Sequence, residues 1–156
     1  WGHFHEIGHN HQSDDWTFEG TVEVTVNLFT LYVYDKVLGK RPEDRSFAGD
    51  YLTKNSSKFA SENWSFDRWK EDPFMALTLY MQKQERFGWD QFKKVFAEYR
   101  KLDRSERPRD DQEKRDQWLV RFSLSAKTNL APHFSHWRIP VSDSARQKVK
   151  GLPAWK

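Results

Sequence analysis

The stretch that decides the fold is Trp-Gly-His-Phe-His-Glu-Ile-Gly-His-Asn-His-Gln, residues 1–12, and its central part is His5-Glu6-Ile7-Gly8-His9. If this stretch is helical, His5 and His9 lie on one face, because residues four apart are neighbours on a helix. Their two imidazoles can then reach one metal ion. Glu6 lies one position round from His5, so its carboxylate is placed to reach a water on that ion rather than the ion itself.

This arrangement is the one that a hydrolytic zinc site needs, with protein ligands and one open position for water. Zinc lowers the pKa of a water from about 15.7 to about 7 and polarises a carbonyl group. Glu6 would take the proton of that water as a general base and deliver it to the leaving nitrogen of a peptide bond. The pattern therefore predicts a peptidase with one zinc ion per chain and Glu6 as the catalytic residue.

A third ligand is needed, and two carboxylates downstream of the motif qualify. Glu19 and Glu23 lie four residues apart, so they share a face if their segment is helical. We favour Glu23, because it lies further inside the predicted helix and is therefore held more firmly, whereas Glu19 lies near the entry turn and frames the site. Asn27 lies on the same face and is a candidate for orienting a ligand from behind.

The same five-residue pattern can arise by chance on a solvated surface helix. Ile7 and Gly8 argue against chance, because a small and apolar stretch suits close packing against a neighbouring helix. Four histidines also crowd into nine positions of the chain. His3 and His11 lie off the ligand face, so we expect them to be polar filler or substrate contacts rather than ligands.

Composition excludes several classes of protein and site. The chain of 156 residues fits one domain or part of one, and it contains no Cys, which excludes disulfides and thiolate metal sites. No apolar run approaches the roughly 18–20 residues of a membrane span, so we expect no span in this segment. The net charge is +3, but basic and acidic residues alternate over Arg104–Arg115 rather than forming one basic stripe. We therefore expect no nucleic-acid partner.

Hydrophobic periodicity predicts a mainly α chain. The stretch 19–38 is ambiguous, because residues 22–28 alternate apolar and polar side chains as a strand does, but about twenty residues closed by Gly39 suit a buried helix better. Asp72, Asp90 and Ser142 are candidate N-caps. We expect mostly loop with short helical turns over residues 40–63 and helices over residues 1–12, 19–38, 73–88, 90–99, 110–128, 132–137 and 142–149.

Several further runs accompany residues 1–12 and extend over nearly the whole chain. They are Trp16-Thr17-Phe18, the run EVTVNLF at 23–29, the run WKEDPF at 69–74, Phe87-Gly88-Trp89 and the run LPAW at 152–155. In these residues the chain resembles the enhancin-like, mucin-degrading metallopeptidases, the sixtieth metallopeptidase family. Vertebrate TRP-channel-associated factors share related sequence.

The resemblance implies a gluzincin-type site, with His5, His9 and Glu23 on one zinc ion and Glu6 as catalyst. It implies O-glycosylated, mucin-like glycoproteins as substrates. It also implies a secreted or cell-surface bacterial enzyme with other domains in a larger chain. The rival interpretation is a non-catalytic interaction or glycan-binding module that retains the peptidase fold, and an intact Glu6 beside three ligands favours the enzyme.

The resemblance also implies a division of the chain. The family has a small sheet before its zinc helix, and those residues are absent here, so we expect a zincin active-site helix followed by an α-helical C-terminal subdomain without the upstream sheet. Residues 1–40 would form the zinc-binding helices and residues 41–156 the helical subdomain. The chain opens on Trp1 without Met, so we expect the natural N-terminus to lie upstream.

Glycan recognition requires aromatic platforms and polar side chains near the metal. Trp1, Asn10, Trp16 and Glu19 are the candidate substrate contacts, and Gln12 is a further polar side chain beside the motif. For both Trp residues, packing in the core is an equal alternative, because Trp serves in both roles. The candidates for stabilising an oxyanion are Tyr32, Tyr34 and Tyr51.

Overall fold

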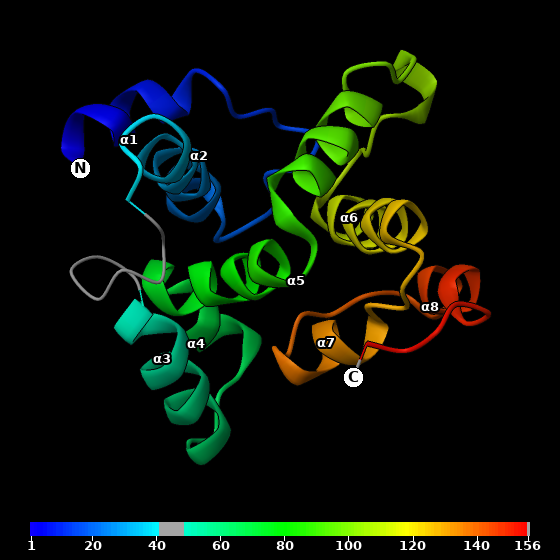
Figure 1. Ribbon diagram of the computed structural model, residues 1–156. Coiled ribbons are helices and arrows are strands. Elements are labelled where there is room, and N and C mark those ends of the chain that lie inside the picture. Colours follow the sequence, from blue (N-terminus) through cyan, green and yellow to red (C-terminus); the bar gives the residue numbers. More distant parts are fainter. Residues whose placement is uncertain (41–48, 156) are drawn as a thin grey trace.

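The computed structural model describes residues 1–40 and 49–155, and for residues 49–53 it describes the backbone only (Figure 1). The described part is mainly helical and contains no strand, so the predicted fold class is confirmed. Its elements are α1 (Gly2–His9), α2 (Val22–Lys36), α3 (Gly49–Ser61), α4 (Phe66–Lys70), α5 (Pro73–Tyr99), the 3₁₀ helix η1 (Arg104–Glu106), α6 (Asp111–Ala126), α7 (Ala131–His136) and α8 (Asp143–Val149).

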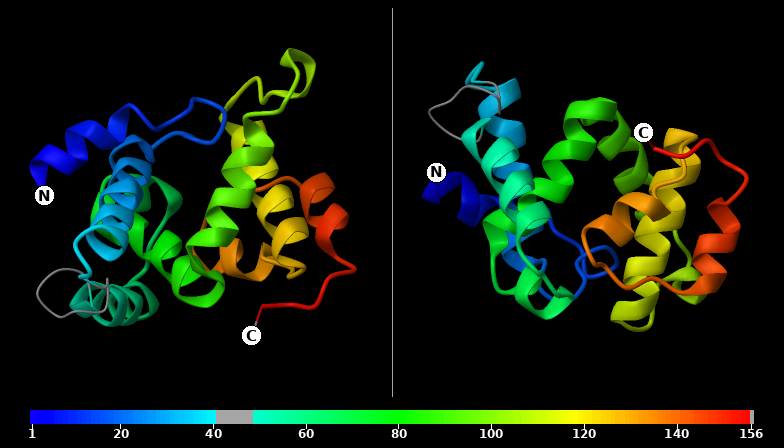
Figure 2. Two further views of the ribbon diagram at one scale, coloured as in Figure 1. Left: turned by 45° about the horizontal axis from the view of Figure 1, so that its top comes forward. Right: turned by 90° about the horizontal axis from the view of Figure 1, so that it is seen from below.

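The long helix α5 crosses the middle of the molecule and divides the other helices into two groups. Helices α1 to α4 lie on one side of the molecule and α6 to α8 on the other, with the two chain ends far apart (Figures 1 and 2). None of the helices in the described part is long and apolar enough to cross a bilayer.

Helix α5 begins where the sequence predicts and contains a break that the sequence also marks. Asp72 caps its first turn, since the carboxylate accepts a hydrogen bond of 2.9 Å from the backbone N–H of Met75. Gly88 has φ 73° and ψ 171°, a backbone conformation that favours glycine, and it kinks the helix. The predicted helices 73–88 and 90–99 are therefore two arms of one element. Asp90 does not cap the second arm but pairs with Lys93.

Helix α3 lies where mostly loop was expected, α4 lies in a stretch for which no element was predicted, and tertiary packing explains the helix at α3. Phe59 is buried, and its ring centroid lies 4.5 Å from that of Trp137, which is far away in the sequence. Short helices gain most of their stability from such packing rather than from local propensity, so periodicity alone underestimates them. The part of the predicted loop at 41–48 lies outside the described residues.

One continuous aromatic core joins the two groups of helices. Trp118 on α6 stacks against Phe96 and Tyr99 of α5, and Trp16, from the segment between α1 and α2, packs on the same two rings. The expected boundary near residue 40 stays a prediction. The segments on either side of it contribute to the same core.

The core also contains a buried ionisable group, Lys83 on α5. Its side chain is fully buried, and its Nζ, which lies 4.6 Å from the centroid of the Phe134 ring, has no hydrogen-bond partner among the described residues. Burial lowers the pKa of this amine well below its usual value, because a charge is poorly solvated there. The pKa of His133 is lowered too, first by burial and then by the nearby Lys83.

The lowered pKa of Lys83 predicts that Lys83→Met stabilises the fold in a pH-dependent way. A lysine whose pKa is lowered in the folded state binds its proton more tightly when unfolded, so it subtracts stability below the unfolded pKa of about 10.4. At pH 7 the substitution should raise the free energy of unfolding by about 1–3 kcal/mol, because each unit by which folding lowers the pKa costs about 1.4 kcal/mol. This gain in the free energy of unfolding should be smaller near pH 10. Urea unfolding of parent and variant at pH 7 and pH 10 measures it. Lys94→Met, at an exposed position of the same helix, is the control. A gain of equal size at both pH values would contradict this account.

Candidate metal centre

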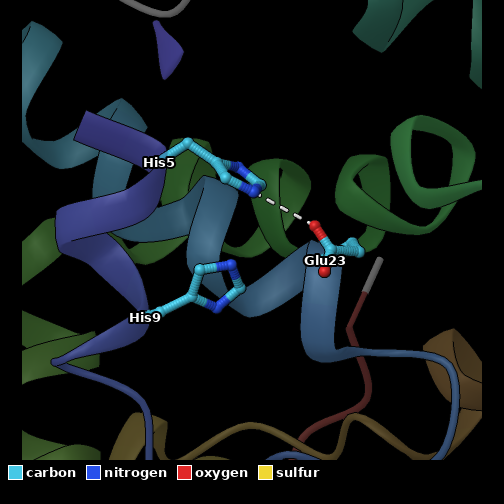
Figure 3. A group of neighbouring side chains, drawn as sticks. All are labelled: His5, His9 and Glu23. Carbon is cyan, nitrogen blue, oxygen red and sulfur yellow. Dashed lines mark ion pairs between the residues drawn. The ribbon is translucent and has the colours of Figure 1, made fainter. Parts of the chain in front are cut away.

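The candidate metal centre lies between α1 and the first turns of α2. Helix α1 places His5 and His9 one turn apart, with ring centroids 5.0 Å from each other and the ring planes nearly perpendicular. Glu23 is the second residue of α2 and reaches toward the two rings from the neighbouring helix (Figure 3).

The two helices meet at Gly8, the buried residue between the histidines. A Cβ atom on Gly8 would lie 2.9 Å from Cγ2 and 3.0 Å from the carbonyl oxygen of Val26, so only glycine allows this approach. Close packing was predicted for Gly8 together with Ile7. The prediction is wrong for Ile7, whose side chain is 54% exposed, because that residue lies on the outer face of α1.

The ligand-type atoms of His5, His9 and Glu23 all lie within 4.8 Å of one another. The shortest distance joins Nε2 of His5 to Oε2 of Glu23, at 3.1 Å. Figure 3 shows the three side chains converging on one space between α1 and α2. The structure thus brings together the three residues that the sequence nominates, and their role as metal ligands is a proposal developed below.

Asn27 determines which nitrogen of His5 faces this space. The Asn27 amide donates a hydrogen bond of 2.7 Å to the backbone carbonyl of Glu23, one turn earlier on α2. Its Oδ1 lies 2.8 Å from Nδ1 of His5 and can only accept. Nδ1 therefore carries a proton, and Nε2 faces Glu23. This hydrogen bond is the contact that the orienting role predicted for Asn27 requires, and the role itself stays a prediction.

Gln12 does the same for His9 and was not assigned this role from the sequence. Its amide nitrogen donates to the carbonyl of Val22 at 2.6 Å and to Oγ1 of Thr25 at 2.5 Å. Its Oε1 accepts from Nδ1 of His9 at 2.8 Å. The signal available was its position three residues after His9, which places it beside that ring when the chain continues turning.

The donor set fits zinc. Nε2 of His5 and a carboxylate oxygen of Glu23 lie 3.1 Å apart, a spacing that a protonated imidazole fills with an ion pair and that a cation can fill instead. Zinc binds such nitrogen and oxygen atoms at about 2.0–2.2 Å in tetrahedral geometry, which places two ligand atoms roughly 3.3 Å apart. Ligating histidines usually donate their other N–H to an oxygen, as both do here.

Glu19 does not share a helical face with Glu23, so that prediction is wrong. Gly20 has φ +79°, and α2 begins only at Val22, which leaves Glu19 in the preceding turn. Its carboxylate forms an ion pair of 2.6 Å with Lys70 of α4. Glu19 therefore fastens the start of α2 to α4 instead of framing the metal centre.

The other residues considered for substrate contacts differ in their burial. Trp16 is 3% exposed and belongs to the core, so its predicted substrate contact is wrong and the packing alternative holds. Trp1 is half-buried at the start of α1, and Asn10 is exposed at its end. His3 and His11 are exposed and outside the group of three metal-ligand candidates.

Two of the three tyrosines proposed to stabilise an oxyanion pack against aromatic side chains. The ring of Tyr32 lies edge-on to Trp89 and beneath Nζ of Lys93, and the ring of Tyr34 packs on Trp1. The side chain of Tyr51 lies outside the described residues.

The sequence matches one protein family and several vertebrate relatives. The profile of the family described as peptidase M60, enhancin and enhancin-like, matches residues 1–138. TRPM8 channel-associated factor 3 of Mus musculus is 36% identical over the whole chain, and a homolog of these factors in Danio rerio is 38% identical over 99% of it. The chain spans about a sixth of the length of these relatives, 17% in each.

A solved structure resembles the whole chain. The crystal structure of a functionally unknown conserved protein from Bacillus anthracis superposes with a TM-score of 0.82 at 30% identity, and the match covers 32% of that protein. The prediction of a secreted or cell-surface bacterial protein is wrong, because the curated relatives are channel-associated factors of vertebrates.

The approach at Gly8 predicts that Gly8→Ala separates α1 from α2. The new methyl group meets a backbone carbonyl that cannot move freely, so we expect a loss of about 1–3 kcal/mol in the free energy of unfolding. Gly2→Ala is the matched control on the same helix, because a Cβ there has no atom within 4 Å. Urea unfolding compares the two. Equal stability of both variants would show that the helices are not in such close contact.

The hydrogen bond from His9 to Gln12 predicts that Gln12→Ala lowers zinc affinity by about 10–100-fold, the usual effect of losing such a partner. Competition with a chromophoric chelator measures this affinity. Gln147→Ala, at an exposed position on α8, should leave it unchanged. If Gln12→Ala binds zinc as tightly as the parent, the orienting role of Gln12 is wrong.

Proposed function

Because the chain belongs to the peptidase M60, enhancin and enhancin-like family, we propose that it is the metal-binding part of a zinc-dependent endopeptidase. The peptidases of this family are in general zinc enzymes. Since the chain covers only a fraction of its relatives' length, the proposal includes further domains of a larger protein, which would complete the substrate cleft.

One observation carries this proposal, the convergence of His5, His9 and Glu23 with both histidine Nδ1 atoms already held by amide oxygens. These three residues would hold the zinc ion. When bound, zinc supplies a Lewis acid that polarises a peptide carbonyl and lowers the pKa of water to about 7. The helix–helix contact at Gly8 keeps the ligand side chains in place before the ion arrives, which reduces the cost of binding it.

Glu6 is the group that moves protons. Its side chain follows His5 directly on α1, is exposed, and has no hydrogen bond or ion pair within the described residues. A carboxylate that is not tied up in the fold is free to accept a proton at one oxygen and deliver it to the leaving amine. Glu6 therefore serves as general base and then as general acid.

We propose O-glycosylated, mucin-like proteins as the substrate class. This part rests on the resemblance to the mucin-degrading members of the family. Of the predicted contacts, Trp1 and Asn10 stay candidates, since they flank α1 at its two ends and neither is buried. An aromatic ring and a side-chain amide are the kinds of group that sugars bind.

The names of the vertebrate relatives support a second candidate, a non-catalytic interaction module. A module of that kind would need the fold but would not need Glu6, a zinc ion or the held histidines. The two candidates differ in one measurable property, peptide hydrolysis that depends on Glu6.

The decisive variant is Glu6→Gln in the longest protein that contains this chain. We expect one zinc ion per chain in parent and variant, because Glu6 is not among the three ligand candidates. We expect kcat/KM on an O-glycosylated mucin peptide to fall by about 10²–10⁴-fold, the usual contribution of general acid–base catalysis. Zinc content is measured by elemental analysis and cleavage by mass spectrometry.

Glu71→Gln, at an exposed position after α4, is the matched control and should cleave like the parent. Equal cleavage by Glu6→Gln would reject the role of Glu6. Zinc binding by a parent protein that cleaves no such peptide would favour the interaction module.

A further inference from the structure

An aromatic pocket lies between α2 and the second arm of α5, apart from the metal centre. Its volume is about 300 Å³. Leu28, Phe29 and Tyr32 of α2 line one side, and Trp89 and Phe96 of α5 line the other. None of these residues belongs to the predicted metal ligands or their hydrogen-bond partners. The pocket therefore has a chemistry of its own, with apolar walls and room for one large side chain.

The rim of this pocket is basic. Lys93 and Arg100 of α5 both lie at it. Lys93 is partly engaged, since its Nζ lies 3.2 Å from a carboxylate oxygen of Asp90 and 5.3 Å from the centroid of the Tyr32 ring. Arg100 is exposed and forms no ion pair within the part of the chain that the structure describes. Residues 93–101 contain four basic residues and one acidic residue, so an approaching anion meets a positive surface.

We propose that this pocket binds a peptide segment in which a large apolar side chain has acidic neighbours. The apolar side chain enters between α2 and α5, and a neighbouring carboxylate reaches the guanidinium of Arg100, which can hold it with two parallel hydrogen bonds. Charge complementarity selects an acidic partner. The size of the pocket, at the lower end of the range for ligand sites, selects a single side chain rather than a long lipid tail.

The pocket is joined to the metal centre through one residue. Phe29 lines the pocket, and its Cβ would lie 3.6 Å from a Cβ on Gly8, while its ring lies 5.8 Å from that of His11. A bound segment therefore contacts the helix that carries Glu23 and Asn27 on another face. Binding of this segment needs neither zinc nor Glu6. The pocket proposal can therefore fail while the proposed peptidase activity holds, and the reverse is also true.

The test uses ¹H–¹⁵N NMR of the zinc-loaded protein with three synthetic peptides and one small acid. The peptides are the N-acetylated amides of Glu-Phe-Glu, Gln-Phe-Gln and Glu-Ala-Glu, and the acid is 3-phenylpropionate. The indole N–H of Trp89, which donates to Asp35, is a reporter at the pocket wall. We expect Glu-Phe-Glu to shift this signal and the amides of Ala97 and Arg100, and to bind at least tenfold more tightly than the other three probes.

Two variants locate the site. Ala97 lines the pocket and is exposed, so Ala97→Trp fills the pocket without disturbing the core and should abolish the shifts, whereas Ala97→Ser should keep them. Arg100→Gln should weaken binding of Glu-Phe-Glu about tenfold and leave that of Gln-Phe-Gln unchanged. Glu6→Gln should bind like the parent.

Several outcomes would overturn the proposal. These are shifts that lie elsewhere or are absent, undiminished binding by Arg100→Gln, and binding of 3-phenylpropionate as tight as that of Glu-Phe-Glu, which would show a site for free acids. If Ala97→Trp does not fold, the affinity of Arg100→Gln for Glu-Phe-Glu, compared with that of the parent, still tests whether the peptide binds in this pocket.

Discussion

The contact between Gly8 and Val26 is the constraint on which the metal centre depends. A helix alone can present two histidines, but the third ligand comes from another helix, and its reach is only that of one Glu side chain. Because Gly8 has no side chain, the backbone of α1 lies against the backbone of α2. The carboxylate of Glu23 can then reach Nε2 of His5 without a shift of either helix.

Hydrogen bonds to the Nδ1 atoms of both histidines fix the orientation of their rings toward the space beside Glu23. Asn27 and Gln12 each use their amide N–H groups on α2 and present an oxygen to one imidazole, so they also tie α1 to α2. The segment between the helices is anchored in turn, because Trp16 lies in the aromatic core. The function proposed for the surface of α1 therefore rests on packing that extends to α5 and α6, and damage to that core should reach the metal centre.

The sequence predicts the parts of this structure that are local. The i, i+4 pair, the cap at Asp72 and the break at Gly88 follow from spacing and backbone preference, and the structure contains all three. The errors have two origins. Glu19 lies off the helical face because the neighbouring Gly20 delays the start of α2, a local signal that residue spacing alone does not record. Trp16 is in the core because Phe96 and Tyr99 of α5 pack on it, and such contacts with residues distant in the sequence leave no periodic pattern. Gln12 could have been found from its spacing to His9.

In the proposed enzyme, two histidines and one glutamate from two touching helices hold a single zinc ion. A crystal structure of the zinc-loaded protein, with anomalous data collected on both sides of the zinc absorption edge, tests it most directly. The account predicts one anomalous peak about 2.0–2.2 Å from Nε2 of His5, Nε2 of His9 and a carboxylate oxygen of Glu23. A peak at other residues, or none between these three, would contradict it.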